Sequence, residues 1–389
     1  MSVPSPRVPD VPPTEPHVGP FLQNAGADTM TVAWIRHDDA ACTLAFAPRS
    51  GAGTELRVRP CRPIEGSTNF FYEARLAGLR PDTRYAYSLR CPGGTVRAHF
   101  RTFPRKSDRL TFIYYGDNKG GHGIHRRLVS RFEQHSPLFV MHSGDMTDHG
   151  TYAEYRPLFF HPLRDVIDHI PLLPGRGNHE GNGKAYRQVF CLPDGDTWYS
   201  VDCAHVHIVV LDTTGWRHEW EKDDSRRMYE WLDADLSASR ATWKIAMHHE
   251  PSYDLGWRKD DWGLQDFLPL MRRHGVDLTL SGHAHGYQRL HPMAACGENE
   301  RHPITHIISA GAGASIGSKP LDPSPYLAAD ARRFNYLVFT VEGERLAVQV
   351  LSEDDETLDA FELVKHDGRY DPAFLARAMP AEDYPKGKV

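Results

Sequence analysis

Leu138-Phe-Val-Met-His-Ser-Gly-Asp-Met-Thr-Asp-His-Gly150 is the stretch that decides the fold. Its apolar start, residues 138–141, predicts a buried strand, and Gly144-Asp145 marks the turn at which that strand ends. A carboxylate at the carboxyl end of a strand in an α/β sheet is rigidly held and faces the crevice where ligands bind. Asp145 is therefore a candidate site residue.

Four other strand-like runs end on a similar polar side chain. They are residues 112–116 before Asp117, 170–177 before Asn178-His179, Trp243–Met247 before His248-His249, and 277–282 before His283-Ala-His285. One strand that ends on an aspartate means little. Five strands that each deliver Asp, Asn or His at the end predict one multi-metal site.

The bulk properties are those of a soluble protein that binds neither nucleic acid nor a membrane. The length of 389 residues predicts two or three domains, and a hydrophobic share of 40% is ordinary for a globular chain. The net charge of -6 offers no basic surface to nucleic acid or to an anionic membrane.

The N-terminus predicts a cytoplasmic protein if Met1 is the true start, and the cysteines argue against a zinc ribbon. None of the six cysteines forms a C-x-x-C pair, which argues against a zinc ribbon and favours scattered thiols. Pairing of Cys191 with Cys203 is the alternative in an exported protein. No apolar stretch follows Met1, and no run reaches the roughly 18 apolar residues of a membrane span. An exported mature form remains the alternative to a cytoplasmic one.

The first hundred residues predict an arm and an all-β domain. Residues 1–20 carry seven prolines, which predicts an extended arm. Short strands separated by turn residues predict a β-sandwich over residues 21–103, with strands at 29–35, 43–47, 56–58, 69–76, 84–89 and 95–102. Residues 79–87 resemble the tyrosine corner of fibronectin type III domains, with Trp34 as the core aromatic. We expect this domain to pack against the next one.

After residue 107 the pattern changes to strands that alternate with helices. Helices are expected at 123–135, 152–160, 224–236 and 267–274, and a hairpin at 198–201 and 205–211. Mostly antiparallel strands at 304–309, 336–341 and 346–350 close the domain. We expect this domain over residues 108–365 and a surface tail over residues 366–389.

The polar strand ends suit a pair of metal ions. Two ions a few ångströms apart need a shared ligand, and a carboxylate bridges them more easily than a histidine. Oxygen and imidazole donors without a thiolate suit Fe, Mn, Zn or Co. The candidate ligands are Asp117, Asp145, Asn178, His248, His283 and His285.

Five short motifs occur in order along the chain. They are Gly116-Asp117, Gly144-Asp145, Gly177-Asn178-His179-Glu180, Ile245-Ala-Met-His248 and Gly282-His283-Ala-His285. This order resembles the calcineurin-like metallophosphoesterases, and the upstream sandwich together with His285-Gly-Tyr287-Gln-Arg289 resembles their purple acid phosphatase branch. The resemblance covers roughly residues 15–365. It implies a four-layer α/β (α+β) sandwich of two mixed sheets flanked by helices.

The resemblance also implies a role for each site residue. Asp145 would bridge two metal ions (Fe, Mn or Zn). The remaining ligands would be Asp117 and His285 for the first ion, and Asn178, His248 and His283 for the second. His179 would contact the phosphate and protonate the leaving oxygen, while a metal-bound hydroxide attacks phosphorus in line. The implied reaction is hydrolysis of a small-molecule phosphate monoester or diester.

Two positions depart from the family pattern. Asp148 stands where purple acid phosphatases have a tyrosine that binds ferric iron, and Lys119 stands where other branches have a histidine. Asp148, His122 or water would then complete the first metal site. We expect a protein that is not purple when it is loaded with iron.

Several neighbours of the motifs have two interpretations. His249 is either a substrate contact or a support behind the ligands, and Glu180 is expected to hold its loop. Tyr287 and Arg289 are expected to be scaffold. Four tryptophans either pack or wall a substrate pocket: Trp216, Trp220, Trp257 and Trp262.

The sequence leaves three alternatives to a general phosphoesterase. Gly313-Ala-Ser315-Ile-Gly317 matches the G-x-S-x-G of serine hydrolases, but that motif requires a helix after the serine, and prolines follow here. A glycine-rich loop is expected instead. A phosphatase tailored to one specific metabolite and a metal-binding protein without turnover remain as alternatives.

Overall fold

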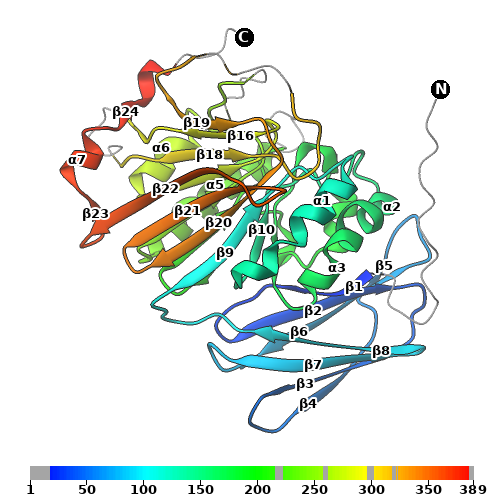
Figure 1. The fold of residues 1–389 in the computed structure, drawn as a ribbon. Coiled ribbons are helices and arrows are strands. Elements are labelled where there is room, and N and C mark those ends of the chain that lie inside the picture. Colours follow the sequence, from blue (N-terminus) through cyan, green and yellow to red (C-terminus); the bar gives the residue numbers. More distant parts are fainter. Residues whose placement is uncertain are drawn as a thin grey trace, which may run out of the picture.

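A computed structural model describes residues 18–214, 222–256, 262–295, 302–317, 321 and 323–384. Figure 1 shows an N-terminal β-sandwich, drawn in blue and cyan, packed against a larger part that contains two further sheets and most of the helices. This order agrees with the predicted all-β sandwich followed by an α/β sandwich.

The N-terminal sandwich consists of two four-stranded antiparallel sheets. One has the order β1-β2-β6-β5 and the other the order β4-β3-β7-β8. The strands are β1 Val18–Gln23, β2 Thr29–Arg36, β3 Cys42–Pro48, β4 Thr54–Val58, β5 Arg62–Pro63, β6 Phe70–Ala77, β7 Arg84–Cys91 and β8 Gly94–Arg101. Tyr85 forms the predicted tyrosine corner, because its hydroxyl accepts the backbone N–H of Arg80 at 2.9 Å. Trp34 is buried and stacks on Tyr72.

The cysteines of the sandwich differ from the expectation. Cys42 in β3 and Cys91 in β7 form a disulfide, whereas Cys191 and Cys203 are free. The antiparallel pairing of β3 with β7 brings the first two together, which spacing along the sequence does not reveal.

The larger part contains two mixed seven-stranded sheets. The first has the order β11-β10-β9-β20-β21-β22-β23, and the second the order β12-β13-β14-β15-β18-β16-β19. The strands of the first sheet are β9 Leu110–Tyr115, β10 Val140–His142, β11 Leu172–Pro174, β20 Asn335–Glu342, β21 Arg345–Ser352, β22 Thr357–His366 and β23 Arg369–Tyr370. Those of the second are β12 Tyr199–Cys203, β13 Val206–Val210, β14 Trp243–Met247, β15 Leu278–Ser281, β16 Tyr287–Leu290, β18 Thr305–Ser309 and β19 Leu327–Ala331. Strand β17 Met293–Ala294 pairs with β24 Met379–Pro380.

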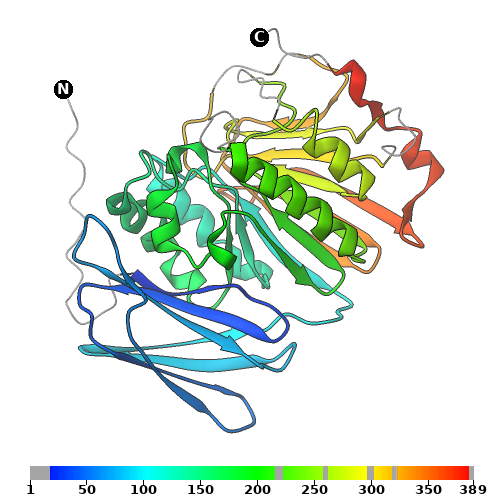
Figure 2. The same cartoon turned by 180° about the vertical axis from the view of Figure 1, so that it is seen from behind.

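Helices cover the outer faces of both sheets. They are α1 His122–Val129, α2 Tyr152–Glu154, α3 His161–Ile167, α4 Lys184–Val189, α5 Lys222–Ala238 and α6 Phe267–Arg273, whereas the short helix α7 Pro372–Leu375 follows β23 and packs against the inner cluster through Phe374. Helices α1, α3 and α4 share a core cluster with the first sheet, and α5 and α6 share one with the second. Figure 2 shows α5 as the long green helix in front. In the described ranges, no helix is long and apolar enough to cross a membrane.

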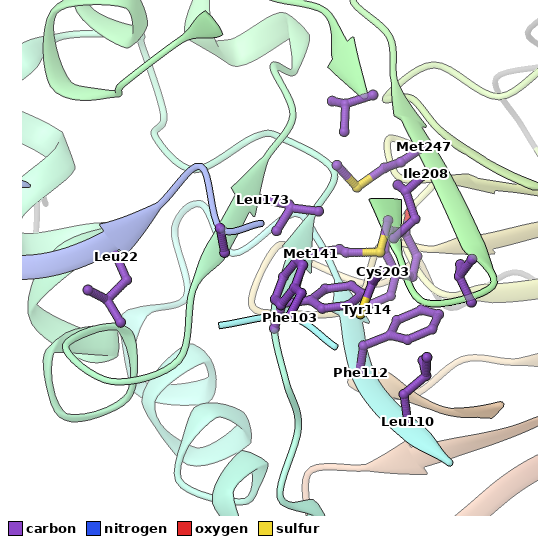
Figure 3. Packing of buried hydrophobic residues seen from close by; sticks show 14 of the residues in the cluster. Leu22, Phe103, Leu110, Phe112, Tyr114, Met141, Leu173, Cys203, Ile208 and Met247 are labelled. Carbon is purple, nitrogen blue, oxygen red and sulfur yellow. The ribbon is translucent and has the colours of Figure 1, made fainter. Parts of the chain in front are cut away.

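The alternation of side chains along each strand produces the layers. Phe112 of β9 packs in the cluster between the two sheets, whereas its neighbour Ile113 packs in the cluster under the helices. Figure 3 shows Met141 of β10 and Met247 of β14, one from each sheet, in the same inner cluster. The predicted four-layer sandwich is confirmed.

The N-terminal β-sandwich packs against the helical side of the larger part and forms hydrogen bonds with it. The Asn69 side-chain amide donates to the Tyr152 hydroxyl at 2.7 Å, and the Tyr87 hydroxyl donates to the Asp168 carbonyl at 2.6 Å. Strand β1 contacts α3 in the same region. The expected packing of the sandwich against the next domain is thus observed.

Both ends of the chain differ from the expectation. Strand β1 begins at Val18, inside the expected arm, and residues 1–17 lie outside the described residues. Most side chains of residues 366–384 lie at the surface, as expected of the tail, but Tyr370 and Tyr384 are buried. The Tyr370 hydroxyl donates to the buried carboxylate of Asp277 at 2.9 Å, which anchors this segment to the second sheet.

His207 in β13 forms a pH-dependent interaction that links the second sheet to α5. Its two ring nitrogens lie 2.8 Å from carboxylate oxygens of Asp202 and of Asp235 in α5. Burial lowers the pKa of His207, but the two carboxylates outweigh burial and raise it to about 9. A histidine with a raised pKa stabilises the fold below its unfolded pKa, and this contribution is lost as the pH rises through the folded value.

We therefore predict that the free energy of unfolding falls between about pH 6.5 and pH 9. His207→Gln should lower the stability at the acidic end and flatten the decline, because glutamine carries no titratable charge. Urea denaturation of both proteins across this range measures the effect. Equal slopes against pH for the two proteins would contradict the role of His207.

Candidate metal centre

Strand pairing brings the polar strand ends to one place. β9, β10 and β11 are parallel neighbours in the first sheet, and β14 and β15 are parallel neighbours in the second. Asp117, Asp145 and Asn178 follow the first three strands, and His249 and His283 follow the other two. The backbone N–H of His283 donates to the Asp117 carboxylate at 3.0 Å, so the two sets meet across the sheets.

The backbone is strained where these residues leave the strands. Asp117, Asp145 and His283 have φ angles of 62°, 57° and 68°. Residues other than glycine rarely adopt this left-handed region, which costs about 1–3 kcal/mol at each position. Surrounding contacts maintain it, among them the hydrogen bond from the Asp117 N–H to the Gly144 carbonyl at 3.0 Å. The side chains are therefore held in fixed directions before any ligand binds.

Two glycines leave room for the carboxylates. A Cβ atom at Gly282 would lie 2.4 Å from Asp117 Oδ2, and one at Gly177 would lie 2.4 Å from Asp145 Oδ1. Both distances are far below any van der Waals contact. Glycine is therefore required at position 282, where the loop approaches Asp117, and at position 177, where the loop approaches Asp145.

Three donor atoms converge beside Asp145. Asn178 Oδ1 lies 2.7 Å from His283 Nδ1 and 3.0 Å from His249 Nε2, and His249 Nε2 lies 3.2 Å from Asp145 Oδ1. The other nitrogen of His249, Nδ1, lies 3.0 Å from the Ser143 carbonyl oxygen. That contact orients the ring and turns Nε2 toward the cluster.

A further set of donors shares Asp145. One atom each from Asp117, Asp145 and His285 lie within 4.8 Å of one another. His285 Nδ1 lies 2.9 Å from the Ser315 carbonyl oxygen, and its Nε2 lies 3.8 Å from Asp117 Oδ1. We call Asp117, Asp145 and His285 the first group, and Asp145, Asn178, His249 and His283 the second group.

The structure brings His249, and not the predicted His248, to the second group. The His248 N–H donates to the Leu280 carbonyl at 3.0 Å, so strand pairing continues past the end of β14 and successive side chains alternate. His248 therefore points to the outer face, where its ring centre lies 4.9 Å from that of Trp262. Its Nδ1 lies 2.8 Å from the Glu250 carbonyl oxygen.

His179 lies beside the centre and belongs to neither group. Its backbone N–H donates to Asp145 Oδ1 at 2.9 Å, and its Nδ1 lies 2.7 Å from the Asp148 carbonyl oxygen. Its Nε2 lies 4.0 Å from Asp145 Oδ2, and 33% of the side chain is exposed. The ring is thus anchored by backbone atoms and directs Nε2 toward the centre from a position that solvent reaches.

Glu180 joins the loops, as its position in the sequence predicts. Its buried carboxylate accepts the backbone N–H groups of Gly177, Asp145 and Met146 at 2.8 Å each. Burial and the nearby charge of Asp145 raise the pKa of Glu180 to about 7, against the opposing effect of these hydrogen bonds. Glu180 therefore supports the loops that carry the donors.

The residues considered for completing the first group behave differently from one another. His122 is exposed, and the candidate metal groups found among the described residues include neither His122 nor Asp148. Lys119 is buried, and its Nζ lies 2.5 Å from Asp145 Oδ2. A positive charge, rather than an additional donor, stands at this side of the first group.

The buried charges make the centre attractive to cations. Burial disfavours the charged form of Asp145, but His249 and Lys119 outweigh burial and hold its pKa well below the usual range. Burial lowers the pKa of His249, but the negative charge of Asp145 raises it, to about 9. A field that draws a proton onto this imidazole also attracts a metal ion. Together with the oxygen and nitrogen donors, it fits a site for Fe, Mn or Zn.

Other residues singled out in the sequence are structural. Trp262 is buried, whereas three of the tryptophans considered as pocket walls lie outside the described residues: Trp216, Trp220 and Trp257. Tyr287 and Arg289 both donate to the Asp359 carboxylate at 2.8 Å, which confirms their role as scaffold. Residues 313–317 form the expected loop, whose contribution to His285 through the Ser315 carbonyl was missed because it is made by backbone.

The chain matches one family model over less than half of its length and known proteins over about three quarters of it. The family model of the calcineurin-like phosphoesterases matches residues 110–287, which contain both groups. Human (Homo sapiens) acid phosphatase type 7 is 28% identical over 336 residues, covering 74% of this chain and 75% of that protein. Purple acid phosphatase 18 of Arabidopsis thaliana is 25% identical over 336 residues, covering 77% of this chain and 72% of that protein.

The likeness extends to the fold. A purple acid phosphatase from yellow lupin (Lupinus luteus) seeds superposes with a TM-score of 0.73, covering 95% of this chain and 77% of that chain at 18% identity. At such identity the superposition shows the fold alone. The family match and the sequence relatives carry the assignment further: the chain contains a calcineurin-like phosphoesterase domain and is homologous to the purple acid phosphatases.

Proposed function

We propose that the chain is a metal-dependent hydrolase of phosphoric esters and that it acts on a small-molecule phosphate monoester or diester. The observation that carries the proposal is the second group, in which donor atoms of Asn178, His249 and His283 lie 2.7 to 3.2 Å apart. Asp145 adds a carboxylate to them. The names of the relatives, acid phosphatases, support the same class of reaction.

The second group would hold an ion of Fe, Mn or Zn through two imidazole nitrogens, an amide oxygen and a carboxylate oxygen. When bound, the ion lowers the pKa of a water molecule and offsets negative charge on the phosphoryl oxygens. Asp117 and His285 are further possible donors, and they lie close to the same residue, Asp145. Binding of the ion therefore depends most on Asp145.

His179 would act on the substrate. In its protonated form, Nδ1–H donates to the Asp148 carbonyl, and Nε2–H points into the same space as Asp145 Oδ2. We infer that His179 contacts a phosphoryl oxygen and transfers its Nε2 proton to the leaving oxygen.

Two adjacent histidines give a matched pair of variants. We predict that His249→Ala loses the bound metal and lowers kcat/KM on p-nitrophenyl phosphate or its bis-ester by about 100-fold or more, because a ligand is removed. His248→Ala should keep the metal and most of the rate, because His248 faces the outer side of the sheet. Metal analysis and initial rates measure both effects.

The same assay tests the reaction class. Chelator-treated protein should be inactive and should regain activity on addition of Mn²⁺, Zn²⁺ or iron, whereas Asp145→Ala should stay inactive with its fold intact. Full activity of Asp145→Ala, or the reversed order of the two histidine variants, would contradict the proposed site. A panel of monoesters and diesters then identifies the preferred ester.

Glu180 provides a prediction on stability. Glu180→Ala leaves the N–H groups of Gly177, Asp145 and Met146 without their acceptor, so the free energy of unfolding should fall by about 2–4 kcal/mol. Glu65→Ala is the control, because the Glu65–Lys184 pair is exposed and should contribute less than about 1 kcal/mol. Urea denaturation measures both. Equal losses in the two variants would show that Glu180 does not hold the loops.

A further inference from the structure

The backbone fixes Lys119 beside Asp145. The Lys119 N–H donates to the Asp145 carbonyl at 3.2 Å, and the loops after β9 and β10 are also joined through Asp117 and Gly144 at 3.0 Å. The side chain is only 8% exposed, and its Nζ lies 2.5 Å from Asp145 Oδ2. The ammonium group is therefore part of the buried centre rather than the end of a mobile surface side chain.

The two oxygens of Asp145 face different partners. Oδ1 accepts the His179 N–H at 2.9 Å and lies 3.2 Å from His249 Nε2, on the side of the second group. Oδ2 faces the ammonium group of Lys119. Asp117, the other acid of the first group, lies two residues before Lys119 in the same loop. An ion held by the first group would have to lie next to this ammonium, and like charges a few ångströms apart repel each other strongly in a buried site.

The balance of charge favours one ion. In their ionised forms, the buried side chains of Asp117 and Asp145 contribute two negative charges, and the buried side chain of Lys119 contributes one positive charge. Counted over these three side chains, one divalent ion brings the sum to a single positive charge, whereas two divalent ions bring it to three. Burying uncompensated charge is costly, so the second of two ions would bind against a large penalty.

We propose that the ammonium group of Lys119 takes the place of one metal ion, so that the chain binds a single ion in the second group. This inference rests on the proposed function and refines it. An ammonium group is a compact charge with three N–H donors, which suits it to a phosphoryl oxygen in the position where a metal would otherwise stand. Lys119 thus supplies the first group with the positive charge that an ion would bring.

The experiment counts metal ions. Wild-type protein and Lys119→Met, a neutral replacement of similar length, are stripped with a chelator and dialysed against excess Mn²⁺. Bound manganese per chain is then measured by elemental analysis. We expect one ion per chain in the wild type and two in Lys119→Met, a twofold rise. Lys184→Met, which removes an exposed lysine paired with Glu65, is the control and should bind one ion.

Each result has a distinct meaning. Two ions in the wild type, or one in Lys119→Met as well, would overturn the inference while leaving the proposed function intact. No bound ion in any of the proteins would overturn the proposed function. If Lys119→Met fails to fold, electron paramagnetic resonance of the manganese-loaded wild type decides instead: the spectrum of isolated Mn²⁺ supports the inference, and that of an exchange-coupled pair overturns it.

Discussion

The centre depends on the buried carboxylate of Asp145. One of its oxygens faces His249 and accepts the His179 N–H, and the other faces the ammonium group of Lys119. No part of this residue is exposed, so water does not stabilise its charge, and cationic or hydrogen-bonding groups must do so. The strand ends, the glycines and Glu180 act together to bring such groups to this one carboxylate.

The fold delivers these groups from two sheets. Parallel strands place their carboxyl ends on a common edge, and the alternation of side chains buries one face of each strand between the sheets and the other under helices. Strained backbone at Asp117, Asp145 and His283 then turns the side chains inward. The N-terminal β-sandwich supports the centre only indirectly. Its contacts at Tyr152 and Asp168 lie on the helical side of the larger part.

The layers were predictable from the sequence because hydrophobic periodicity reports which face of a strand is buried. The order of the motifs likewise located five of the six predicted ligands at the site. The spacing of a motif, however, does not decide which of two adjacent histidines faces inward. The hydrogen bond between the backbones of His248 and Leu280 decides it, and this contact joins residues far apart in the sequence. The ion pair of Lys119 with Asp145 and the disulfide of Cys42 with Cys91 could not be predicted from the sequence either. Each joins two segments that come together only in the folded chain.

Anomalous X-ray diffraction from crystals of the manganese- or zinc-loaded protein tests the central claim most directly. The account predicts a metal peak bonded to Asp145, Asn178, His249 and His283, with the Lys119 ammonium group still in contact with Asp145. A peak bonded to His248, or the absence of any peak beside Asp145 in fully loaded protein, would contradict it.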